Sequence, residues 1–311
     1  MKALRLKPDA RTRRRFFVPE SFAHPAKMAT GLVEEIAARY DIKPGSWVLD
    51  PMAGSGTTML LALQGINVCL VELEQHFITP MKASWEKMRQ SPMLGYELGQ
   101  VLILRGDARR LPLGRVDIIC TSPPYEGSVD SQHDGIDWTK QADGRKKQEP
   151  HGVGGKPFAY TRPDLVITSP PYEEILSANH KSALGDVKAQ GSSYETFQQP
   201  HNDQNIGNLR GQNYWTEISK VYIECHRCLK PGGLMVLVVK GFTRNGQYVD
   251  LPAQTQECCE GVGFHFVEQW ERQLWGLSFW RTLQLKKGSF DERLRFEHVL
   301  AFQREHIPNE E

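Results

Sequence analysis

Residues 48–58 read VLDPMAGSGTT and decide the fold. The apolar run that ends at Asp50 is typical of a buried strand, and Thr57 opens a segment of helical character. Gly54 and Gly56 allow a tight turn between the two and a close approach of a ligand to the backbone. A strand, a glycine turn and the free amides of a helix start form the kind of site that binds nucleotides. The stretch is neither a dinucleotide G-x-G-x-x-G fingerprint nor a P-loop, because no third glycine and no Gly-Lys-Ser/Thr follows.

On both sides of this stretch, short apolar runs alternate with amphipathic segments. This alternation predicts an α/β fold with a Rossmann-like, doubly wound, mostly parallel sheet. The predicted helices are residues 27–40, 57–65, 76–90 and 214–229. The predicted strands are residues 46–50, 67–72, 100–108 and 234–240, a fourth strand at 115–120 between the last two, and a closing pair at 264–270 and 297–304.

The alternation stops between residues 126 and 212, which are rich in Gly, Gln, Asn, His and Lys. Because structureless loops of that length are uncommon in compact domains, we interpret the segment as a functional, loop-rich insertion. The domain division is therefore a catalytic domain at 1–125 and 213–311, with an inserted region at 126–212.

Acidic residues end three successive predicted strands. Asp50 precedes the glycine turn, Glu72 ends the next strand, and Asp107 ends the third. A carboxylate about 20 residues after such a turn can accept hydrogen bonds from both ribose hydroxyls, and Asp107 can accept one from an adenine amino group. Together the three predict an adenosine ligand.

The pentapeptide TSPPY occurs twice, at Thr121–Tyr125 and at Thr168–Tyr172. An exocyclic amine conjugated to a base ring is a poor nucleophile, and Ser Oγ with the following Pro carbonyl can accept its two N–H bonds as an attack develops. The two prolines stiffen the loop. The tyrosine offers a face on which an extruded base can stack. No Pro-Cys pair occurs in the chain, so a covalent mechanism through such a cysteine has no candidate.

At most one copy can follow the strand beside the glycine turn. The first copy is one short connection from the third predicted strand, and we predict that it occupies this position. The alternative is the second copy, with Ser169, Pro170 and Tyr172, which would make residues 121–164 an insertion ahead of the fourth strand. The copy that does not take this position would be a turn that packs or binds without catalysing.

The combination resembles the amino-group DNA methyltransferases, especially the N4-cytosine type. DPMAGSGTT is similar to their S-adenosylmethionine motif, TSPPY to their catalytic motif, and HPAKM at 24–28 to the segment that holds the methionine end of the cofactor. The resemblance covers most of residues 20–125 and 213–304, and it implies the methyltransferase fold and S-adenosylmethionine as cofactor. The cofactor-binding residues it implies are His24, Pro25, Lys27, Asp50, Pro51, Ala53, Gly54, Gly56, Thr57, Thr58, Glu72, Asp107 and Ala108. The catalytic residues it implies are Ser122, Pro123, Pro124 and Tyr125.

The substrate implied by the resemblance is double-stranded DNA with one base flipped out. A serine at the start of S-P-P-Y is typical of relatives acting on cytosine, while those acting on adenine usually carry Asp or Asn, so N4-cytosine is expected and N6-adenine is the alternative. Methylation of RNA or of a protein glutamine amide, and a non-catalytic DNA-binding role, are further alternatives. A cognate restriction endonuclease would be a partner if the enzyme belongs to a restriction-modification system.

Target recognition is expected in the insertion and in residues 275–287, where aromatic and basic side chains are interleaved. The insertion contributes Trp138, Lys140, Arg145, Lys146, Lys147, Lys156, Phe158 and Tyr160; the second region contributes Trp275, Phe279, Trp280, Arg281, Lys286 and Lys287.

Composition limits the other possibilities. The 311 residues are 40% hydrophobic and 24% charged with a net charge of +1, ordinary values for a globular protein. No apolar stretch approaches the roughly 20 residues needed to cross a bilayer, and no signal peptide is recognisable, so a cytoplasmic protein without membrane contact is expected. CHRC at 225–228 has metal-ligand spacing, but Cys225 falls on an apolar helical face, so we expect a core residue and no metal site.

Overall fold

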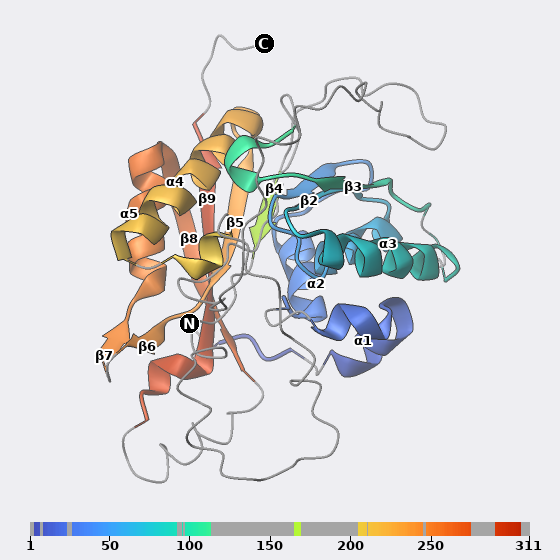
Figure 1. Cartoon of the computed structure of the whole chain (residues 1–311), viewed down its shortest axis with the longest axis horizontal. Coiled ribbons are helices and arrows are strands. Elements are labelled where there is room, and N and C mark those ends of the chain that lie inside the picture. Colours follow the sequence, from blue (N-terminus) through green and yellow to red (C-terminus); the bar gives the residue numbers. More distant parts are fainter. Residues whose placement is uncertain are drawn as a thin grey trace, which may run out of the picture.

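The structure is a computed structural model that describes residues 3–6, 9–23, 27–91, 95, 97–112, 165–168 (backbone), 205–209, 211–244, 247–274 and 290–305. Its centre is a seven-stranded sheet in the order β3-β2-β1-β4-β5-β9-β8 (Figure 1). The strands are β3 (Val101–Arg105), β2 (Asn67–Glu72), β1 (Trp47–Asp50), β4 (Leu165–Thr168), β5 (Leu234–Val239), β9 (Phe296–Arg304) and β8 (Phe264–Gln273). The first five are parallel, and β9 is antiparallel to both its neighbours. The predicted doubly wound, mostly parallel fold is confirmed.

Helices cover both faces of this sheet because its strands are apolar on both faces. In β5, Val236 and Val238 face one core, and Leu237 and Val239 face the other. One layer contains α1 (Ala10–Phe16), α2 (Thr30–Arg39), α3 (Gln75–Arg89) and the 3₁₀ helix η2 (Thr57–Gln64); the other contains α4 (Gly211–Cys228) and α5 (Leu251–Val262). The helix predicted after the glycine turn is thus 3₁₀ rather than α, and it ends at Gly65 with φ 79°.

The structure corrects the predicted position of the fourth strand. β4 pairs with β1 through Val48↔Leu165 and Leu49↔Val166, and with β5 through Thr168↔Leu237. Since β2 occupies the other side of β1, the prediction that the strand at 115–120 takes this place is wrong. Residues 165–168, which lie within the predicted insertion, form a strand of the central sheet. The first copy of TSPPY lies outside the described residues.

Two α-helices were not predicted, α1 and α5, although the boundaries of α5 carry ordinary signals. In α5, Asp250 caps the start by accepting a hydrogen bond of 3.2 Å from the Ala253 amide, and Pro252 lies in the first turn. Gly263 ends the helix with φ 108°. The remaining elements are the 3₁₀ helices η1 (Pro19–Ala23), η3 (Ala108–Arg110), η6 (Ile206–Asn208) and η7 (Glu292–Arg295), and the hairpin β6 (Phe242–Arg244) and β7 (Gln247–Val249).

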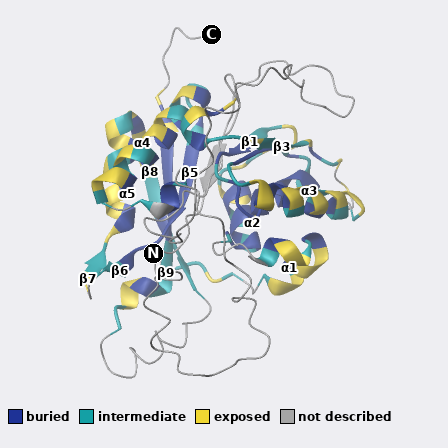
Figure 2. Ribbon diagram, in the orientation of Figure 1, coloured by how far each residue is buried: buried dark blue, intermediate teal, exposed yellow. Residues whose placement is uncertain are grey.

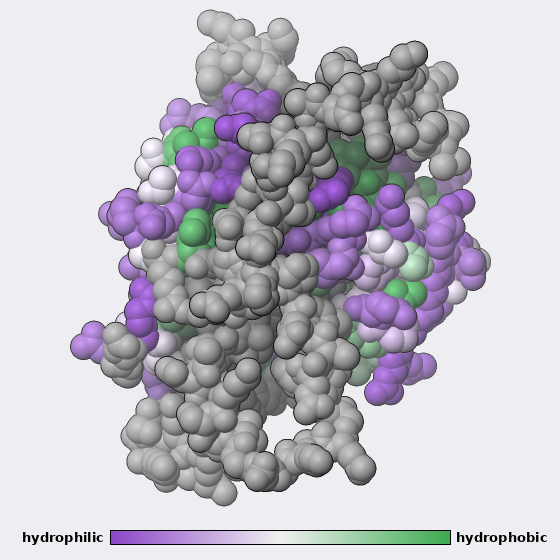
Figure 3. Space-filling view, in the orientation of Figure 1, coloured by the Kyte–Doolittle hydropathy of each residue, from purple (hydrophilic) through white to green (hydrophobic). Residues whose placement is uncertain are grey.

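Burial follows the layers. The strands β1, β2, β5 and β9 are mostly buried, whereas the edge strands β3 and β8 are mostly of intermediate burial. In Figure 2 the helices carry exposed residues on their outer sides. On the face seen in Figure 3 the described residues are mainly hydrophilic, with apolar ones in small groups. Within the described ranges, no helix has the length and apolar character needed to cross a membrane.

Candidate cofactor site

Asp50 holds the glycine turn in place. Its carboxylate is only 2% exposed and accepts hydrogen bonds from Thr58 Oγ1 at 3.0 Å and from the Met52 amide at 3.3 Å. Between these anchors Gly54 and Gly56 adopt φ 52° and 69°, which side chains other than glycine rarely tolerate. The predicted strand, turn and helix start are therefore present, and Asp50 acts on the shape of the loop.

Glu72 links the end of β2 to the same turn. One carboxylate oxygen accepts a hydrogen bond of 2.7 Å from the Gly54 amide, and the other accepts one of 2.9 Å from the Glu74 amide. Burial raises the pKa of Glu72 to about 7, despite the opposing effect of these backbone donors. A carboxylate offers about four lone-pair sites, and the backbone amide of Leu73 also acts on this one, so part of its accepting capacity remains for ligand hydroxyls.

Asp107 continues the row of acids at the end of β3 but is already paired. Gly106 donates from its amide to the Glu72 carbonyl at 3.0 Å, which brings Asp107 next to the end of β2. The Asp107 carboxylate binds Arg109 Nη2 at 2.6 Å, and Arg109 Nη1 binds Glu217 of α4 at 2.5 Å. A ligand amine would therefore share Asp107 with Arg109. Ala108, also predicted, is buried beside it.

Of the three cofactor residues predicted in the methionine-end segment, Lys27 is described, while His24 and Pro25 lie outside the described residues. The Lys27 ammonium donates to the Phe22 carbonyl at 2.9 Å. Burial, followed by the nearby Arg13 charge, lowers the pKa of Lys27 to about 8. Residues 40–46 join α2 to β1 by a short connection, so α2 runs opposite to β1 and its start lies at the end of the sheet that carries the glycine turn.

Sequence reasoning missed two groups near this edge. Arg13, in the basic run at 11–15, is 7% exposed and contacts residues just ahead of α2. Lys240 directly follows β5 and is 1% exposed; Leu237, three residues before it, pairs with Thr168 at the end of β4. The only visible signal for Arg13 was an acid four residues earlier, at Asp9.

The two TSPPY copies differ in what the structure describes. Of the second copy, Thr168 is the last residue of β4, and Ser169 to Tyr172 follow it outside the described residues. The predicted catalytic residues Ser122, Pro123, Pro124 and Tyr125 also lie outside them, as do the predicted recognition residues at 138–160 and 275–287.

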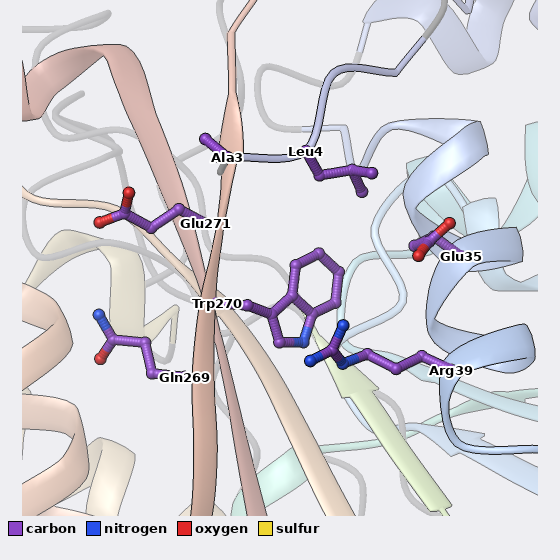
Figure 4. Close-up of a pocket in the computed structure, with 7 residues that line it drawn as sticks. All are labelled: Ala3, Leu4, Glu35, Arg39, Gln269, Trp270 and Glu271. Atoms are coloured by element: carbon purple, nitrogen blue, oxygen red, sulfur yellow. The ribbon is translucent and has the colours of Figure 1, made fainter. Parts of the chain in front are cut away.

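A cavity of roughly 410 Å³ lies at the opposite edge of the sheet, on β8 (Figure 4). Trp270 lines it together with Leu4 of the N-terminal segment and Arg39 of α2, whose guanidinium lies 5.1 Å from the indole ring centre. None of the predicted cofactor residues lines this cavity.

The cysteines are placed as core residues. Cys225 and Cys228 are fully buried in α4, which confirms the interpretation of Cys225. Across the ranges described above, no group of three or more His, Cys, Asp or Glu side chains is arranged to hold a metal ion.

Comparison with known proteins gives distant structural similarities. No protein-family model matches the chain, and no curated protein matches it either. Among solved structures it is similar to the cyclase SpnF, with 12% identity over 90% of this chain and 82% of the other at a TM-score of 0.46. It is similar to TrmN from Thermus thermophilus, with 16% identity over 94% of this chain and 52% of the other, at a TM-score of 0.44. It is also similar to a SAM-dependent methyltransferase from Aquifex aeolicus, with 10% identity over 96% of this chain and 98% of the other, at a TM-score of 0.42. These values do not assign the chain to a family.

Proposed function

We propose that the protein is an S-adenosylmethionine-dependent DNA methyltransferase that modifies the exocyclic amino group of a flipped-out base. N4 of cytosine is the first candidate and N6 of adenine the second. The observation that carries the proposal is the position of β4: it lies directly beside the strand that ends in the glycine turn, and the sequence leaving it is Ser-Pro-Pro-Tyr.

The described residues fit an adenosine ligand at the end of the sheet. Gly54 and Gly56 leave the turn without side chains where a ligand would approach the backbone. Glu72 keeps lone pairs for the ribose hydroxyls, and Asp107 stands at the next strand end for the adenine amine. Lys27 supplies a cation for the opposite end of the ligand. S-adenosylmethionine, when bound, supplies a methyl group on a sulfonium.

We assign the catalytic loop to the second copy. The chain can hold only one loop beside β1, and β4 leads into Ser169. Ser169 Oγ and the Pro170 carbonyl would accept the two N–H bonds of the target amine, which favours the tetrahedral nitrogen that attacks the methyl group. Tyr172 would stack on the extruded base, and Pro171 would limit the loop's freedom.

The serine favours cytosine through the resemblance, because relatives acting on adenine usually carry Asp or Asn there. Serine accepts a hydrogen bond from either amine, so adenine is retained as the second candidate. The basic and aromatic residues at 138–160 and 275–287 are proposed to contact the phosphates and displaced bases of double-stranded DNA.

Mass spectrometry of nucleosides from the DNA of cells that express the protein tests the proposal. N4-methylcytosine is expected in wild-type cells and its absence in cells expressing Ser169→Ala. N6-methyladenine would favour the second candidate. In parallel, tritium from labelled S-adenosylmethionine should enter DNA; its entry only into RNA or protein would refute the DNA substrate, and no transfer to any of the three would refute methylation.

A further inference from the structure

We propose that Arg13 of α1, together with Lys27, binds the carboxylate at the methionine end of the cofactor. The inference rests on the proposed cofactor and adds to it a positioning cation from the N-terminal helix. Neither the glycine turn nor the TSPPY motif indicates this residue.

Arg13 is built into the segment that precedes α2. Its Nη2 donates a short hydrogen bond to the Met28 carbonyl, and its Nε pairs with Asp9 at 2.8 Å. Asp9 also lies 3.5 Å from the Thr30 amide, at the start of α2. The pair thus contacts the chain immediately after Lys27, which places the guanidinium beside the methionine-end segment.

One nitrogen of this guanidinium donates no hydrogen bond within the described residues. Arg13 Nη1 is buried and has no hydrogen-bond partner among the described residues. A buried charged donor without a partner is unfavourable, so a ligand oxygen that accepts a hydrogen bond from Nη1 removes that cost. The side chain is 8% exposed and its Nε and Nη2 are occupied, so Nη1 is the guanidinium nitrogen that remains to donate to a ligand.

The charge around Arg13 is suited to a monoanion. Its charged neighbours include Lys27 and Arg272 as cations and Asp9 as a carboxylate. Arg272 is itself paired with Glu297. Three cations and two carboxylates leave one excess positive charge, which matches a single carboxylate better than a doubly charged phosphate. Burial strengthens the attraction because little water screens it.

The experiment compares two adenosine ligands by isothermal titration calorimetry. S-adenosylhomocysteine carries the amino-acid carboxylate and 5′-methylthioadenosine lacks it, while both present the same ribose and base. We expect Arg13→Met to weaken binding of S-adenosylhomocysteine about 10- to 100-fold, as expected for a lost charge-assisted hydrogen bond, and to change binding of 5′-methylthioadenosine less than twofold. Arg14→Met, an exposed neighbour with the same charge change, should alter neither.

A purely structural role predicts a different pattern. If Arg13→Met weakened the binding of both ligands equally, or of neither, Arg13 would not bind the carboxylate. Arg13→Lys keeps the charge and covers the case in which Arg13→Met does not fold; it should lose affinity only for the carboxylate-bearing ligand, and equal loss for both would again overturn the inference. Failure of the wild-type protein to bind either ligand would refute the proposed cofactor rather than the role of Arg13.

Discussion

The amide of Gly54 donates to a carboxylate oxygen of Glu72 at 2.7 Å, so the turn after β1 and the end of β2 form one unit. The bond that fixes the orientation of this buried carboxylate also fixes the loop. If Glu72 binds the ribose as we propose, its protonation is coupled to the ligand, since ribose hydroxyls donate to the carboxylate more favourably than to the acid.

The first prediction is a fall in cofactor affinity at acid pH. The pKa of Glu72 is raised to about 7 in the free protein because burial disfavours its charge, and ribose donors should lower it in the complex. The complex then holds fewer protons than the free protein. The affinity for the cofactor should rise with pH up to about pH 7 and stay constant above it. Below pH 7 it should fall by at most about tenfold for each pH unit. Calorimetry at several pH values measures this; Glu72→Gln should abolish the acid dependence, and an unchanged profile in that variant would refute the coupling.

A second prediction concerns the alkaline side. The pKa of Lys27 is lowered to about 8 by burial and by the Arg13 charge, so its ammonium loses the proton above that pH. A carboxylate-bearing ligand should therefore bind more weakly above pH 8. Binding of 5′-methylthioadenosine should stay constant there, because it has no carboxylate. Lys27→Met should weaken the binding of S-adenosylhomocysteine at pH 7, and its affinity should no longer fall above pH 8. If the affinity of the variant still fell there, the titrating group would be one other than Lys27.

Two glycines with positive φ, Gly56 in the glycine turn and Gly45 ahead of β1, should lose different amounts of stability when they are replaced by alanine. Gly56 has φ 69°, and a Cβ there would lie 2.7 Å from Met81 Cγ and 2.9 Å from Met59 Cε. Gly45 has φ 87° with nothing within 4 Å of its Cβ position. Gly45→Ala should cost about 1–2 kcal/mol for the backbone alone. Gly56→Ala should cost about 1–3 kcal/mol more for overpacking. Urea unfolding measures both, and equal costs would mean that the methionines move aside freely.

Arg109 should matter more for stability than its neighbour. It joins Asp107 at the end of β3 to Glu217 of α4, and its side chain is 17% exposed. Arg109→Met removes the cation between two carboxylates, and partial exposure of those acids limits the loss to about 1–3 kcal/mol. Arg110→Met, at an exposed position, should change the unfolding free energy by less than about 0.5 kcal/mol. Comparable losses in both would show that the network adds little.

The sequence predicted the elements whose signal is local. Residues 67–72 form a strand with the predicted bounds because Val68 to Val71 are apolar throughout, as expected for a strand covered on both faces. The glycine turn was predictable for the same reason, since its geometry depends on Gly54 and Gly56 themselves. Glu72 was identified by its position at a strand end, but its bond to Gly54 and its raised pKa depend on burial that only the tertiary structure provides.

Two features depended on long-range contacts. The apolar runs ahead of both TSPPY copies are equally suited to a strand, and the pairing of Val166 with Leu49 is decided by topology rather than by either run. Arg13 looked like one of several solvated charges at 11–15. Its contact with the Met28 carbonyl joins α1 to the segment ahead of α2, 15 positions along the chain, which no local period reveals.

The last prediction compares the two pentapeptides directly. If the second copy is the catalytic loop, Ser169→Ala removes an acceptor for the target amine, and Tyr172→Ala removes the stacking surface. Both should lower the rate of methyl transfer by about 100- to 1,000-fold while S-adenosylhomocysteine still binds. Ser122→Ala and Tyr125→Ala are the matched controls and should change DNA affinity or stability at most, because β4 already fills the place beside β1. Loss of activity only in the first pair would show that a loop from outside the central strands reaches the methyl group. Equal loss in both pairs would mean that the two loops meet over the same base, with one of them arriving from above the sheet.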